Sequence, residues 1–132
     1  MRASQFLIGV ATAILLIDGP ALAPPVIDIN HLFQQWSRSY EEEQSSQTVQ
    51  VFRPTASKAF PPSRFRMVYT FARNGTCEYY VLSPDDSHHF DACTFSVVKS
   101  DKTRLQIKEA EATTDFKIVE LSEKVLRLEP SQ

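Results

Sequence analysis

An Asn-Gly pair between two alternating segments constrains the fold of this chain more than any other feature. Residues 65–73 place aromatic or apolar side chains at every second position, Asn74-Gly75 follows closely, and residues 77–82 form a second extended segment. An Asn-Gly connection favours a two-residue type I′ turn, because both central residues of that turn need positive φ. The sequence therefore predicts a β-hairpin in the middle of the chain.

Short segments of strand character recur along the rest of the chain, with turn residues between them. They comprise residues 48–53, 92–99, 104–109, 115–121 and 125–129. No helix-length apolar pattern alternates with these segments, which excludes parallel α/β folds. We predict an all-β fold, a small antiparallel meander closed or nearly closed into a barrel, with a two-sheet sandwich as the alternative.

One short helical turn is expected ahead of the strands. Ile29, Leu32, Phe33 and Trp36 fall at helical spacing, and Asp28 precedes them as a candidate N-cap. The predicted barrel therefore begins with a short N-terminal helical turn that leads into Trp36.

Residues 1–23 have the layout of an export signal. Arg2 precedes an apolar run over residues 6–17, and Ala21-Leu22-Ala23 offers a small-x-small cleavage site. The run is too short to span a bilayer. We expect residues 1–23 to be removed, which leaves a single barrel domain over residues 24–132 in the periplasm or outside the cell. An uncleaved anchor is the alternative.

Only two cysteines, Cys77 and Cys93, occur in the chain. In an exported protein such a pair indicates one disulfide, and antiparallel pairing of residues 76–82 with residues 92–99 would place the two opposite each other. A metal pair and a reactive thiol are the alternatives. Acidic and basic residues are interspersed at a net charge of −2, which does not favour nucleic acid or a membrane surface as a partner.

Four sequence pieces together resemble a known group of proteins. They are Trp36-x-x-Ser39-x-Glu41-Glu42, Arg53-Pro54, Phe60-Pro61-Pro62-Ser63-Arg64-x-Arg66 and Phe71-x-x-Asn74-Gly75. Over residues 36–128 the chain is similar to small lipocalin-like (calycin) β-barrel proteins, mostly bacterial and uncharacterised. The resemblance implies a barrel fold and brings no established activity.

The same resemblance implies a role for Trp36. In such barrels the N-terminal tryptophan packs across the closed end, and an arginine from a late strand stacks on it. Arg127 matches that late position, with Arg64 or Arg66 as substitutes. A guanidinium over an indole contributes on the order of 1 kcal/mol.

The charged residues of the resemblance form a second candidate cluster. They are Glu41, Glu42, Arg53, Arg64 and Arg66. We expect an ion network that pins the proline segment over one end of the barrel, with a polar mouth for an anionic ligand as the alternative. Adjacent glutamates on a strand point to opposite faces, which argues against paired acid–base chemistry.

Residues 83–91 read as a polar loop that contains possible metal ligands. These are Asp85, Asp86, His88, His89 and Asp91. Because solvated hairpin connections have the same composition, no metal and no other cofactor is expected. No serine or cysteine has a recognisable base partner, so we predict a protein that is not an enzyme.

Two functions remain for such a barrel. A row of alternating apolar residues would line or fill its interior and bind a small apolar or amphipathic ligand: Phe65, Met67, Tyr69, Phe71, Tyr79 and Val81. The alternative is a protein-interaction or inhibitor module of the cell envelope or secretome that acts through residues 55–63 and 83–91. An internal cavity would favour the first function, and a solid core with an exposed apolar patch the second.

Overall fold

The computed structural model describes residues 27–85, 87–98 and 103–131. The predicted signal segment and its cleavage site lie outside the described residues. Eight strands and two short 3-10 helices make up the described chain. In order they are η1 (Ile29–Leu32), β1 (Gln35–Arg38), η2 (Tyr40–Glu42), β2 (Gln50–Pro54), β3 (Val68–Phe71), β4 (Thr76–Leu82), β5 (His88–Val97), β6 (Arg104–Lys108), β7 (Thr113–Leu121) and β8 (Leu126–Pro130).

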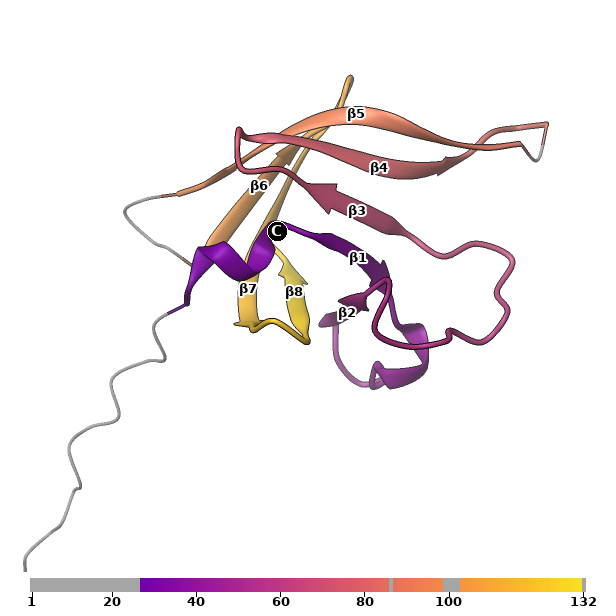
Figure 1. Ribbon diagram of the computed structural model, residues 1–132, viewed down its shortest axis with the longest axis horizontal. Coiled ribbons are helices and arrows are strands. Elements are labelled where there is room, and N and C mark those ends of the chain that lie inside the picture. The colour runs from indigo at the N-terminus through magenta and orange to yellow at the C-terminus, as the bar shows by residue number, and fades with distance from the viewer. Residues whose placement is uncertain (1–26, 86, 99–102, 132) are drawn as a thin grey trace, which may run out of the picture.

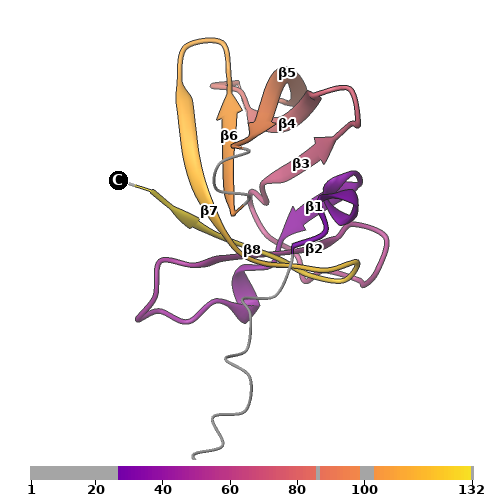
Figure 2. The same ribbon diagram turned by 90° about the vertical axis from the view of Figure 1, so that its left-hand side faces the viewer.

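The strands close into a barrel in the order β1-β2-β8-β7-β6-β5-β4-β3, and every neighbouring pair is antiparallel (Figures 1 and 2). The predicted all-β closed barrel is confirmed, and the sandwich alternative is excluded. The strands expected from the sequence are present, with ends shifted by a few residues. None of the helices described here has the length and apolar character that crossing a bilayer requires.

One strand departs from simple meander order. Strands β3 to β8 pair consecutively, but β1 lies between β2 and β3. Residues 55–67 therefore return from one end of the barrel to the other along the outside of β1. The Oγ of Ser37 lies 2.8 Å from the Oγ1 of Thr55, and Lys58 Nζ donates to Ser39 Oγ at 3.2 Å. This crossover buries Ser37 on the outer face of β1 and Ser39 directly after the strand.

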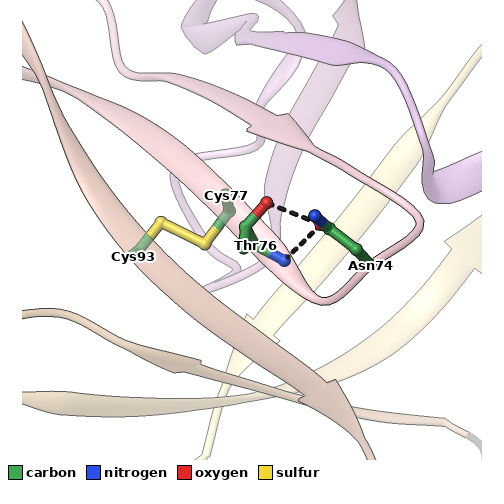
Figure 3. The surroundings of a disulfide bond; sticks show 4 residues. All are labelled: Asn74, Thr76, Cys77 and Cys93. Carbon is green, nitrogen blue, oxygen red and sulfur yellow. Dashed lines mark hydrogen bonds between the residues drawn. A yellow bond between two sulfur atoms is a disulfide. The ribbon is translucent and has the colours of Figure 1, made fainter.

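The β3–β4 hairpin forms as predicted, but its turn has three residues instead of two. The Ala72 N–H donates to the Thr76 carbonyl, and the Gly75 N–H donates back to the Ala72 carbonyl. Gly75 has a φ of +88°, and Asn74 Oδ1 accepts hydrogen bonds from both the amide and the hydroxyl of Thr76 (Figure 3). The expected two-residue type I′ turn is wrong because the Asn74 side chain takes the amide that such a turn would use.

The predicted disulfide is present between neighbouring strands. Cys77 and Cys93 are register partners on β4 and β5, with a Cα–Cα distance of 4.8 Å (Figure 3). Both residues are buried and belong to the core cluster. The bond therefore joins the two strands near the base of the β4–β5 hairpin, one residue pair from the Thr76–Thr94 end of the ladder.

Strand β5 begins earlier than the sequence suggests. The loop predicted over residues 83–91 is limited to the connection between Leu82 and His88, where Asp85 accepts bonds from the amide and hydroxyl of Ser87. Residues 88–91 continue the ladder with β4 instead. The resulting β4–β5 hairpin is long, and it reaches past the neighbouring strands (Figure 1).

The core fills the end of the barrel that η1 covers. Asp28 accepts from the Asn30 amide as the predicted N-cap, and the Trp36 indole N–H donates to the Leu32 carbonyl at 3.0 Å. Gln34 and Arg73 hold this end to the neighbouring turns. The buried cluster consists of Leu32, Trp36, Phe52, Tyr69, Phe71, Cys77, Cys93, Leu105, Ile107, Phe116, Ile118, Leu121, Leu126 and Leu128.

Candidate functional site

Arg66 anchors the crossover to the end of β1. Its guanidinium donates to both carboxylate oxygens of Glu41, at 3.0 and 2.8 Å, and to the backbone carbonyls of Arg38 and Pro61. The hydrogen bonds from Arg66 lower the pKa of Glu41 to about 2. Because one of the carbonyls belongs to the proline segment, this arginine fixes that segment against the barrel.

Glu42 forms the second part of the same outer network. Arg53 donates to its two oxygens at 2.9 and 2.6 Å, Ser39 Oγ donates at 2.7 Å, and Lys58 Nζ lies 3.6 Å away. The hydrogen bonds from Arg53 lower the pKa of Glu42 to about 2. Arg53 also donates to the Lys124 carbonyl, which links β2 to the β7–β8 turn.

One further pair, which the sequence did not single out, lies beside this outer network on the inner face of β1. Arg38 donates through two guanidinium nitrogens to the carboxylate of Glu43, and Glu43 also accepts the Val51 amide at 3.1 Å. The signal available in the sequence was strand alternation, which places Arg38 on the same face of β1 as Trp36. All three glutamates of residues 41–43 thus face an arginine.

The predicted polar cluster is therefore only partly assembled. Glu41, Glu42, Arg53 and Arg66 come together as the expected ion network, whereas Arg64 is exposed and forms no ion pair with any described residue. Since its arginines are already bound by carboxylates, the cluster fits a structural role better than an anion-binding mouth.

Trp36 is fully buried, but no arginine of the described chain stacks on it. The predicted stacking of Arg127 on Trp36 is wrong, because Leu126 and Leu128 occupy the inner face of β8. Arg127 consequently faces outward and binds Glu120 at 2.8 Å. The indole N–H of Trp36 donates its hydrogen bond to the Leu32 carbonyl instead.

The predicted ligand-binding row divides between three environments. Tyr69 and Phe71 are buried in the core, and Met67 and Tyr79 pack against it. Val81 is half-buried nearer the hairpin tip. Phe65 does not line the interior. Its ring stacks on that of Tyr80, with ring centroids 5.7 Å apart, and Tyr80 lies on the face of β4 opposite to Tyr79.

The barrel end opposite η1 carries polar groups beside the core. Desolvation, and then the nearby Glu109 carboxylate, raise the pKa of Tyr69 to about 12. The same two causes raise the pKa of Tyr79, and burial raises the pKa of Glu109 itself. Tyr69 and Tyr79 thus lie at this end of the core, with the partly buried Glu109 carboxyl close enough to raise the pKa of both.

An aromatic cluster that the sequence did not predict lies on the outer face of the β4–β5 hairpin. Tyr80 is its centre: its ring centroid lies 5.7 Å from Phe65, 5.0 Å from Phe90 and 5.1 Å from His88. Phe90 is 45% exposed. We call these four residues the hairpin aromatic cluster. The sequence does contain one signal for this cluster, the Tyr79-Tyr80 pair. Because neighbouring residues of a strand point to opposite faces, only one of these two rings can face the core.

The histidines of the hairpin are engaged in local contacts. His88 Nδ1 is hydrogen-bonded to the Tyr80 hydroxyl, and His89 contacts Ser83 Oγ at 3.0 Å and Asp91 at 3.1 Å. Within the described residues, no group of three or more histidine, cysteine, aspartate or glutamate side chains is placed to hold a metal ion. The polar side chains of this segment therefore serve hairpin contacts.

Comparison with protein-family models, with curated proteins and with solved structures finds no match to this chain. The fold and its exposed groups therefore carry the functional argument.

Proposed function

We propose that this protein is an exported, non-enzymatic barrel that acts as a protein-interaction module, with the protruding β4–β5 hairpin as its contact surface. One observation carries the proposal: the exposed Phe90 ring and the half-buried Tyr80 and Phe65 rings gather at a hairpin that extends from a barrel with a filled centre. Aromatic side chains are enriched at protein interfaces and carry much of their binding energy.

Export to the periplasm or the extracellular space is part of this proposal. The layout of residues 1–23 and the Cys77–Cys93 disulfide support it. A kinship with the small lipocalin-like proteins is also proposed. It rests on the four sequence pieces and on an eight-stranded antiparallel barrel with which such a fold is compatible.

The interaction function is tested by photo-crosslinking in the organism from which the protein comes. A benzophenone amino acid replaces Phe90 in one variant and Val119 in a control, because Val119 is an apolar residue of β7 with a similar exposure of 43%. We expect protein adducts from position 90 and none from position 119. No adduct at position 90, or equal adducts at both, would contradict the proposal.

A small amphipathic ligand at the barrel end opposite η1 is the second candidate. The placement of Tyr69 in the core and of Tyr79 against it, at the end that also carries Glu109, favours this candidate, because apolar rings near a carboxyl group suit a molecule with an apolar body and a hydrogen-bonding group. A fluorescent naphthalene-type dye should then bind wild-type protein and lose affinity in Tyr79→Ala. Equal dye fluorescence with and without protein would remove this candidate.

A further inference from the structure

The β4–β5 hairpin has a free backbone edge outside the closed part of the barrel. All of β4 pairs with β5, but β5 pairs with β6 only through residues 94–97. Within the part of the chain that the structure describes, residues 88–93 of β5 therefore have a strand on one side only. A row of unpaired amides and carbonyls on an edge is a template for pairing with another strand.

The ladder identifies which groups point to that edge. The Phe95 N–H donates to Gly75 ahead of β4, whereas the Val98 N–H donates to Arg104 on the β6 side. Alternation then directs the amides and carbonyls of His88, Phe90 and Ala92 away from β4, toward the edge.

The space beside the edge is open. A hollow of about 350 Å³ lies where the β5 edge meets the end of β6. Its lining residues are Ala92, Cys93, Thr94, Lys108, Glu109 and Ala110. No described strand covers the edge, so an incoming strand could reach its backbone groups.

We infer that the free edge of β5 binds the same edge of a second copy of this chain, in an antiparallel pairing centred on Phe90. This inference rests on the proposed function and names its partner. In this register His89 of each copy lies opposite Asp91 of the other, so the interface carries two complementary pairs. The edge-directed groups of His88, Phe90 and Ala92 also face edge-directed groups of the second copy.

Neighbouring registers lack this complementarity. Centring the pairing on Asp91 would place the two Asp91 carboxylates directly opposite each other, and like charges in that position are destabilising. Centring it on His89 would oppose the two imidazoles and leave Asp91 without its partner. A shift by a single residue would mismatch the edge-directed amides and carbonyls.

The outer face of the hairpin supports the same register. Phe90 would lie opposite Phe90 of the second copy, which joins the two hairpin aromatic clusters into one continuous row. The pairing would cover a ring that is 45% exposed in the single chain. Because the two edges are identical and related by a twofold axis, the assembly closes at two copies.

A charge exchange with mixing tests this inference on the purified full chain. His89→Asp opposes two aspartates in each pair, and Asp91→His opposes two histidines. Sedimentation equilibrium should show a wild-type dimer, and the dissociation constant of His89→Asp should rise by about tenfold. Val119→Ala is the control variant and should dimerise like wild type.

Mixing the two single variants separates the interface from effects within one chain. His89 and Asp91 also contact each other inside one copy, at 3.1 Å. An equimolar mixture of His89→Asp and Asp91→His leaves that internal contact broken in both chains but restores both pairs across the interface. We therefore expect the mixture to form heterodimers with near wild-type affinity.

Each outcome separates this inference from the proposed function. A wild-type dimer with restored association in the mixture supports the inference. A dimer that His89→Asp does not weaken, or a mixture as weak as the single variants, overturns the register. A monomer at all concentrations overturns the self-pairing, and the interaction function then stands if position 90 still crosslinks to a different protein in the host and fails if it does not.

Discussion

At the scale of single residues, the outer ion network shows how one crossover segment is held to a barrel. Glu41 and Glu42 each receive two hydrogen bonds from an arginine, and Arg66 adds two bonds to backbone carbonyls. Bidentate arginine–carboxylate pairs have a fixed geometry that a lysine cannot reproduce. These side chains therefore position residues 55–67 instead of offering charge to a ligand.

The lowered pKa values of Glu41 and Glu42 predict acid sensitivity. Both carboxyls have a pKa of about 2 in the folded protein against an ordinary value of 4.5, so the unfolded chain binds more protons between these values. Their contribution to stability is complete above pH 4.5 and is lost as the pH falls toward 2. Glu109, whose pKa is raised, has the opposite dependence above pH 4.5.

Urea unfolding at a series of pH values measures this effect. The free energy of unfolding of wild-type protein should fall as the pH drops from 4.5 to about 2. Glu42→Gln should show a shallower fall over the same range, because it has lost one of the two titrating groups. Identical slopes for wild type and Glu42→Gln would contradict the assignment.

Single residues also show where sequence reasoning succeeds and where it stops. The charged residues of the resemblance predict a network of positions 41, 42, 53, 64 and 66, and all of them except Arg64 come together in it. The prediction that Arg127 stacks on Trp36 is wrong, because Leu126 and Leu128 face the core and the side chain of Arg127 between them therefore points outward. Arg38 and Glu43 were missed because neither belongs to a recognisable motif.

At the scale of secondary structure, the two hairpins around β4 differ in how far sequence specifies them. The Asn-Gly pair located the β3–β4 hairpin, although the hydrogen bonds of Asn74 lengthen its turn to three residues. The polar residues His88, His89 and Asp91 predict a loop where the structure has the early part of β5. Polar residues are expected at positions 88–91 once β5 is known to extend past the barrel. The extension itself depends on how β4 and β5 pair in the folded protein, which local sequence does not specify.

Gly75 tests the turn geometry of the β3–β4 hairpin. A Cβ at this position would meet only the Phe95 carbonyl oxygen at 3.7 Å, an ordinary contact, so the φ of +88° is what a side chain would disturb. Gly75→Ala should lower the free energy of unfolding by about 1 kcal/mol. Gly75→Asn should cost less, because asparagine tolerates positive φ.

Denaturant unfolding of these two variants beside wild type provides the measurement. Alanine and asparagine add side chains at the same site, so their difference reports backbone conformation. Equal stability of Gly75→Ala and wild type would show that residue 75 does not hold a positive φ.

At the scale of the whole molecule, strand order is the feature that sequence could not supply. Alternation and turn signals predicted the strands and their closure. They do not reveal that β1 lies between β2 and β3, because the alternation of side chains along a strand is the same whichever strand it pairs with. The 13-residue segment 55–67 is long enough to cross β1, and the burial of Ser37 and Ser39 records that it does.

The disulfide contributes to the stability of the whole barrel. Cys77 and Cys93 are 16 residues apart in sequence, and a loop of this size predicts about 3 kcal/mol of stabilisation from restriction of the unfolded chain. Cys77→Ala with Cys93→Ala should therefore unfold at lower urea concentration than the oxidised wild type. An unchanged unfolding midpoint would mean that the bond does not constrain the unfolded chain.

The central claim is that this protein has a filled barrel and acts through the free edge of its protruding hairpin. Residue-resolved amide hydrogen exchange, measured in dilute and in concentrated protein, tests it most directly. The amides of His89 and Asp91 point to β4 and should be protected at both concentrations, whereas those of Phe90 and Ala92 should become protected only in concentrated protein. Fast exchange of Phe90 and Ala92 at both concentrations would contradict pairing at this edge.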